Sequence, residues 1–150
     1  MRPDATDSSA PTGAGGEGTE AGMSLPGQSA HVQAEAVIGT LAALKDEGYE
    51  SLVDMFGCDT GESIELTYHL RSYAKDRDAY VKTVVPYDAE VASVWNVYPG
   101  ALMPERETAE LLGLHLAGHP NPRRLLTTDG VPPLLRRSVA IRSVEEVKRR

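Results

Sequence analysis

Apolar and polar side chains alternate without interruption through the segment SIELTYHLRSY, residues 63–73. One set comprises Ile64, Leu66, Tyr68 and Leu70, and the other comprises Glu65, Thr67, His69 and Arg71. Successive side chains of a strand point to opposite faces of a sheet, so this period of two predicts a half-buried antiparallel strand. Such a strand requires hydrogen-bonding neighbours at its edges and a layer that covers its apolar face.

The flanking segments supply the neighbouring strands. YESLVDMF (residues 49–56) and AYVKTVVPY (residues 79–87) are rich in β-branched and aromatic residues. The short polar segments GCDTGES and AKDRD, on either side of residues 64–73, predict turns, and Pro86 should end the last strand. Three consecutive strands with short connections predict an antiparallel meander.

Helices should cover this sheet. Val37, Leu41 and Leu44 recur at helical spacing, and Gly48 is suited to the end of that helix. Two short helices are expected after the sheet, over DAEVASVWNVY (residues 88–98) and from Pro104 to Gly113. The sequence therefore predicts an α+β fold: a three- to four-stranded antiparallel meander, an N-terminal helix and two short helices, followed by an extended C-terminal arm.

The composition of the two ends differs from that of the centre. Residues 1–30 contain six glycines, three prolines and no aromatic residue, which predicts a disordered low-complexity tail. Its GAGGEG matches a dinucleotide-binding pattern but lacks the strand and helix which that pattern requires. The start of the natural chain, Met1 or Met23, stays open. We expect a domain over residues 31–118 and an extended, basic, partner-binding arm over residues 119–150, whose prolines oppose regular structure.

Charge is divided unevenly between the body and the arm. Residues 1–120 contain 7 Lys and Arg against 19 Asp and Glu, whereas residues 121–150 contain 8 against 3. A basic arm on an acidic body suits a nucleic acid or an acidic protein. Binding to single-stranded nucleic acid usually uses stacking aromatic side chains, and none follows Tyr98, so we favour a protein partner. The sequence contains no apolar run long enough to span a membrane and no signal peptide, which favours a cytoplasmic location.

Residues 105–126, ERETAELLGLHLAGHPNPRRLL, hold the candidate functional side chains. Glu105 and Glu107 should point to different sides of a helix, so they do not form a catalytic carboxylate pair. We expect Glu107 and Glu110 to lie among exposed or arginine-paired charges. These residues therefore predict no acid–base site.

Metal binding and nucleophilic catalysis are equally disfavoured. His115 and His119 have a spacing that would align two ligands on a helix, but Gly118 and Pro120 oppose a helix there. Cys58 is the only cysteine, so neither a disulfide framework nor a cysteine-ligated cluster can form. The sequence predicts an assembly subunit whose arginines and leucines contact another protein.

The same stretch resembles the signature of a family of respiratory complex I, that of its thirty-kilodalton or C subunit, which also occurs in related membrane-bound nickel–iron hydrogenases. The family pattern has the form E-R-E-x-x-D-x-x-G-I, then G-H-P and R-R-L-L, and later P-L-R-K-D. The matching residues are Glu105, Arg106, Glu107, Glu110, Gly113, Gly118, His119, Pro120, Arg123, Arg124, Leu125, Leu126, Pro133, Leu134, Arg136 and Arg137. The resemblance extends over about residues 48–140, with SLVDMFGCD and IELTYHLRS similar to the family's first two strands.

The resemblance implies a subunit without a cofactor of its own. It implies packing on the large subunit (the D subunit of complex I, or the hydrogenase large subunit) and a position at the inner face of the cell membrane through the complex. The NADH:quinone oxidoreductase and hydrogenase branches both stay open, as do the electron donor, the electron acceptor and the translocated ion. The alternative is a free-standing binding module whose basic arm binds an acidic protein or a nucleic acid.

Overall fold

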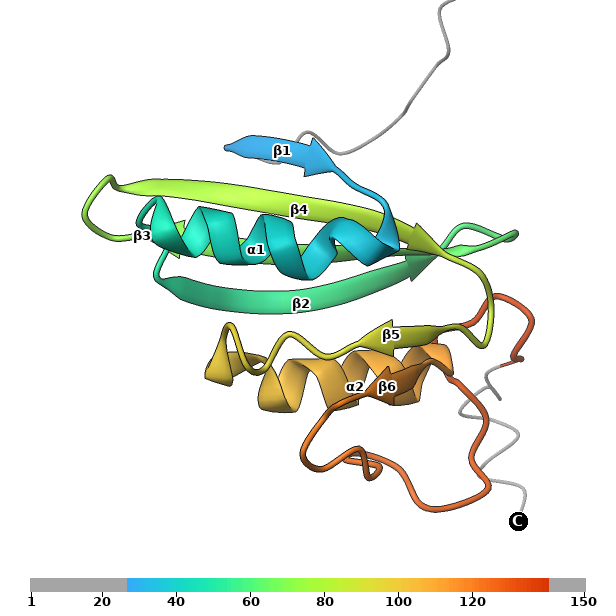
Figure 1. Ribbon diagram of the computed structural model, residues 1–150. Helices are drawn as coiled ribbons and strands as arrows, with labels where there is room; N and C mark the ends of the chain where they lie inside the picture. Colours follow the sequence, from blue (N-terminus) through green and yellow to red (C-terminus); the bar gives the residue numbers. More distant parts are fainter. Residues whose placement is uncertain (1–26, 141–150) are drawn as a thin grey trace, which may run out of the picture.

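The computed structural model describes residues 27–140 and contains a four-stranded sheet with the strand order β1-β4-β3-β2 (Figure 1). Strands β2 (Ser51–Asp59), β3 (Ile64–Ser72) and β4 (Arg77–Val85) form the predicted antiparallel meander. Strand β1 (Gln28–His31) pairs with β4 in parallel. Gln28 to Ala30 therefore belong to the sheet rather than to the predicted tail, because their backbone groups pair with the free edge of β4. The rest of that tail lies outside the described residues.

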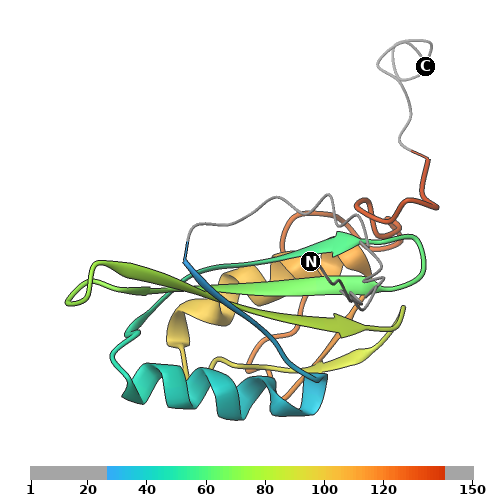
Figure 2. The ribbon, with the colours of Figure 1, turned by 90° about the horizontal axis from the view of Figure 1, so that it is seen from above.

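The alternation in β3 determines which face of the sheet is buried. Ile64, Leu66, Tyr68 and Leu70 are completely buried, as predicted. Helix α1 (Val37–Asp46), which follows a short 3-10 turn η1 (Ala34–Ala36), packs Val37 and Leu41 into the same core. Figure 2 shows that α1 lies on one side of the sheet.

The segment between the sheet and the second helix departs from the prediction. Residues 88–98 were expected to form a helix, but Glu90–Ala92 form strand β5, which pairs in parallel with strand β6 (His115–Ala117). The predicted turn after β2 also begins late, since Gly57, Cys58 and Asp59 continue that strand. A side chain at position 57 would contact Leu112, so a glycine there allows the second helix to pack closely against β2.

Helix α2 (Leu102–Leu112) follows a 3-10 turn η2 (Pro99–Ala101) and packs against β2. It ends as predicted at Gly113, which adopts the left-handed conformation with φ = 69°. Helix α2, β5 and β6 form a group beside the β2 side of the sheet (Figure 1).

The arm leaves β6 at Gly118, and residues 119–140 contain no helix or strand. These residues do not extend away from the domain. They turn back and lie against α2, and Arg137 reaches Asp59 in β2, to whose carboxylate its N–H donates at 2.8 Å. The last part of the predicted arm, residues 141–150, lies outside the described residues.

Candidate partner-binding site at the junction of α2 and the arm

The first residue of the site is a buried acid in the first turn of α2. Glu105 is completely buried, whereas Glu107 is exposed, so the two carboxylates point to different sides of the helix as expected. The Ser93 hydroxyl and the Val94 N–H both donate to its carboxylate at 2.6 Å. Burial raises the pKa of Glu105, and these two hydrogen bonds oppose that effect. Glu105 thus joins α2 to the segment that follows β5.

A buried histidine continues this contact into the arm. The side chain of His119 is inaccessible to solvent, and its Nε2 lies 3.0 Å from the Leu102 carbonyl oxygen. The Asn121 N–H donates to Nδ1 at 3.0 Å. A neutral ring protonated at Nε2 satisfies both contacts. Nε2 also lies 3.7 Å from the Glu105 carboxylate, so His119 anchors the start of the arm beside the buried acid.

His119 is consequently unsuited to the metal pair considered from the sequence. Both of its ring nitrogens are engaged, and His115 is an exposed residue of β6 rather than the preceding turn of a helix. Within residues 27–140, no cluster of three or more His, Cys, Asp or Glu side chains could hold a metal ion.

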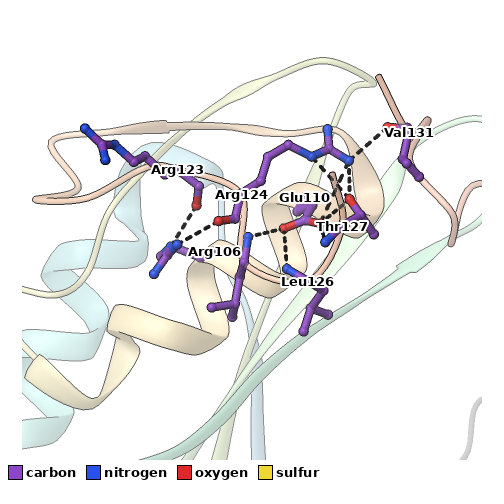
Figure 3. Close-up of polar contacts among 8 residues, drawn as sticks. Arg106, Glu110, Arg123, Arg124, Leu126, Thr127 and Val131 are labelled. Carbon is purple, nitrogen blue, oxygen red and sulfur yellow. Dashed lines mark hydrogen bonds and ion pairs between the residues drawn. The ribbon is translucent and has the colours of Figure 1, made fainter. Parts of the chain in front are cut away.

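Arg106 binds the backbone of the arm. Its Nε donates to the Arg123 carbonyl at 2.7 Å, and its Nη2 donates to the Arg124 carbonyl at 2.8 Å (Figure 3). A planar guanidinium suits two adjacent carbonyls because its donors are fixed relative to one another. Arg106 therefore recognises the conformation of the arm and not its side chains.

Glu110, one helical turn later, binds the next three residues through their N–H groups. Its carboxylate accepts hydrogen bonds from the backbone of Leu125, Leu126 and Thr127, and from the Thr127 hydroxyl. Burial alone would raise the pKa of Glu110, but these four hydrogen bonds outweigh it and lower the pKa from 4.5 to about 2. Of the two predicted environments, exposed or arginine-paired, Glu110 has the second, since Arg124 lies 3.8 Å away, and it is also a fixed anion at the centre of a loop.

Arg124 closes that loop from the other side. Its guanidinium donates to the Thr127 hydroxyl and, at 2.9 Å, to the Val131 carbonyl (Figure 3). It also lies 3.8 Å from Glu110. The Arg124 side chain is therefore used within the chain, whereas the sequence suggested that it faces a partner.

Arg136 holds the far end of the arm on the C-terminus of α2. It donates to the carbonyl oxygens of Leu112 at 2.6 Å and Gly113 at 3.0 Å, two of the groups left free where a helix ends. It also pairs with Asp88 at 2.8 Å and lies over the ring of Tyr87, 4.9 Å from the ring centroid. Arg136 thus caps α2 and connects it to the segment before β5.

Gly113 allows the close approach of this part of the arm. A side chain there would lie 2.6 Å from Pro133, in addition to the strain of its left-handed backbone. Gly118 also has a positive φ, of 73°, but a side chain there would contact nothing within 4 Å. Gly113 is therefore required for both space and conformation, and Gly118 for conformation alone.

The remaining motif residues have more exposed positions. Glu107 and Pro120 are exposed, and Leu125 and Leu134 are half-buried. Arg123, Leu126 and Arg137 are exposed, with Leu126 at 57%. The motif thus divides into side chains that hold the arm in place and side chains that the arm displays to solvent.

Several contact residues carried no signal in the sequence. Ser93, Asp59, Asp88 and Tyr87 lie far along the chain from the motif residues that they bind. Tyr87, Asp88 and Ser93 flank β5, whose pairing with β6 no local pattern predicts, and Asp59 is the last residue of β2. The arrangement as a whole binds main-chain atoms of the arm to α2, so its role within the chain is to hold the arm in place.

Comparison with known families shows to which family the chain belongs. The family model described as "Respiratory-chain NADH dehydrogenase, 30 Kd subunit" matches residues 30–143. The chain belongs to this family. The match includes β2, β3, β4, α2 and the described part of the arm, so the resemblance predicted over about residues 48–140 is confirmed.

Individual relatives agree with the family assignment. The chain is 39% identical over 101 residues to the C subunit of NADH-quinone oxidoreductase from Phenylobacterium zucineum, an alignment that includes 65% of this chain and 48% of that one. The corresponding protein of Caulobacter vibrioides is 36% identical over 104 residues, 65% of this chain and 53% of that one. The alignments thus span about half the length of these curated relatives.

A solved structure has the same fold. A chain of the membrane-bound sulfane sulfur reductase, an archaeal respiratory membrane complex, superposes with a TM-score of 0.69 at 24% sequence identity. The superposition includes 81% of this chain and 75% of the other. The α+β fold expected for the family is thereby confirmed. Within residues 27–140, neither helix has the length and apolar character needed to cross a bilayer.

Proposed function

We propose that this chain is a scaffold subunit of a complex-I-like membrane oxidoreductase and performs no electron transfer itself. In this proposal the complex is either an NADH:quinone oxidoreductase or the related hydrogenase type. The subunit lies at the inner face of the membrane and packs on the large subunit of the complex. Family membership supports the class of complex, and the similarity to C-subunit relatives supports the position within it.

One observation supports a scaffolding role most strongly: most charged side chains of the motif, though not those of Glu107, Arg123 and Arg137, are engaged within the chain. Arg106 and Glu110 bind the backbone of residues 123–127, and His119 and Glu105 are buried together. A catalytic acid, base or ligand needs access to a substrate or cofactor. These groups are instead used to fix the shape of the arm, as expected for a docking element prepared in advance.

Affinity purification tests the proposal directly. The full chain carries a tag and is purified from detergent-solubilised membranes of the cell that makes it, and the co-purifying proteins are identified and quantified. The proposal predicts equimolar recovery of a large subunit of the complex I or hydrogenase type. Recovery as a free monomer, or with nucleic acid that is released at high salt, would favour the free-standing binding module.

A further inference from the structure

A hollow of about 290 Å³ lies between β6 and the arm, on the side of α2 where the chain turns back. Leu114, Leu116 and Pro122 contribute apolar surface to its lining. Arg123 contributes a cationic side chain, and His115 contributes an imidazole ring. The hollow therefore combines a small apolar floor with a basic rim.

Arg123 is the member of the rim that is free to bind a ligand. Its residue is exposed, and among the described residues its guanidinium has no hydrogen bond or ion pair. Figure 3 shows this guanidinium pointing away from the polar cluster, while the carbonyl of the same residue accepts the hydrogen bond from Arg106. Its backbone is thus fixed and its charge is available.

The other charges of the lining do not compete for an incoming anion. Glu110 lies in the wall, but its negative charge is offset by the guanidinium of Arg124 at 3.8 Å, and its oxygens already accept hydrogen bonds from three backbone N–H groups. Arg124 is engaged with Thr127 and Val131. The uncompensated charge at the hollow is therefore the positive charge of Arg123, to which His115, exposed on β6, adds a second hydrogen-bonding group.

We infer that this hollow binds a segment of the large subunit in which an Asp or Glu stands next to an apolar side chain. The carboxylate pairs with Arg123, and the apolar side chain lies on Leu116 and Pro122. The identity of the partner rests on the proposed function, whereas the chemistry of the segment rests on the hollow itself. Arg106, Glu110 and Arg124 act as positioning residues, since they hold the arm so that Arg123 stands at the rim.

The test uses the full tagged chain in the cell that makes it, with three variants. Arg123→Glu should reduce recovery of the large subunit about tenfold or more at low salt, and added salt should narrow the difference. Arg123→Lys should retain most of the binding, since it keeps the charge. Arg77→Glu, at an exposed arginine at the start of β4, is the matched control and should leave recovery unchanged. All three variants should have the melting temperature of the wild type. The two substitutions at Arg123 leave its carbonyl, which accepts the hydrogen bond from Arg106, unaffected.

Photo-crosslinking identifies the bound segment. The photoreactive residue p-benzoylphenylalanine replaces His115 in one sample and Arg77 in another, and crosslinked peptides are sequenced by mass spectrometry. A crosslink from position 115 to a large-subunit peptide that contains an acidic residue beside an apolar one supports the inference. A normal yield of large subunit with Arg123→Glu, or a crosslink from position 115 to a segment without acidic residues, overturns it while the proposed function stands. Absence of any large subunit with the wild-type chain overturns the proposed function itself.

Discussion

The substitution Glu110→Gln should destabilise the domain by about 2 kcal/mol at neutral pH, the scale of one hydrogen bond to a charged group. The glutamine has the size of the native side chain but lacks its charge, and one carboxylate oxygen becomes an NH₂ group. Each oxygen of Glu110 accepts from two donors of residues 125–127, so the NH₂ group must face at least one backbone N–H. That N–H loses a charge-assisted hydrogen bond, which is worth about 1.5–3 kcal/mol.

The pKa of Glu110 gives an independent magnitude. A carboxyl group whose pKa falls from 4.5 to about 2 on folding stabilises the folded state by about 3 kcal/mol at neutral pH. Water can partly replace the lost acceptor near Leu126, which is 57% exposed, and this reduces the expected loss to about 2 kcal/mol. Because the folded pKa is depressed, this contribution is complete above pH 4.5 and disappears as the pH falls toward 2.

Urea unfolding at pH 7, 5 and 3 measures this effect. The free energies of unfolding of wild type and Glu110→Gln should differ by about 2 kcal/mol at pH 7 and 5, and this difference should fall to roughly half at pH 3. Glu107→Gln is the matched control, because Glu107 is an exposed residue of the same helix. Equal stability at pH 7, or a difference that does not change with pH, would show that Glu110 does not hold the arm.

Three other predictions concern stability. In the same urea assay, Glu105→Gln should gain stability relative to wild type as the pH rises from 4.5 to 8. Burial raises the pKa of Glu105, so the stabilising contribution of this group in wild type is lost as the pH rises through the folded pKa. The opposite trend would contradict the burial of Glu105. Gly57→Ala should cost about 1–3 kcal/mol by overpacking against Leu112 and Leu66, and thermal unfolding at wild-type temperature would contradict that packing. Removal of residues 1–26 should leave the melting temperature unchanged, whereas removal of residues 1–31 also removes β1 and should lower it.

The parts of the fold that depend on local pattern were predictable. The buried face of β3 followed from the alternation of Ile64 to Leu70, and the end of α2 followed from Gly113. The error at residues 88–98 has a non-local cause. Glu90–Ala92 form β5 because β6, which follows only after α2, offers a parallel edge, and the next residues are held by Glu105, which binds Val94.

The sequence singled out the motif residues at the junction of α2 and the arm, but neither their contact residues outside the motif nor the geometry of the junction. The motif includes Glu105, Glu110 and Arg124, yet a pattern of letters does not show that the arm turns back onto α2. The sequence therefore predicted an exposed or arginine-paired Glu110 and an Arg124 that contacts a partner, because charged side chains are usually found at the surface. Their burial follows from the arm, which supplies backbone donors and acceptors that no periodicity encodes.

The central claim is that the motif residues hold a docking arm and perform no electron transfer. The most direct test uses membranes from cells in which the Glu110→Gln or the Arg106→Ala variant replaces the wild-type chain. The amount of assembled complex is measured by quantitative mass spectrometry, and quinone reductase or hydrogenase activity is measured on the same sample. The amount of assembled complex should fall, and the turnover per assembled complex should equal that of wild type. Normal assembly with a reduced turnover per complex would show that the motif residues take part in electron transfer.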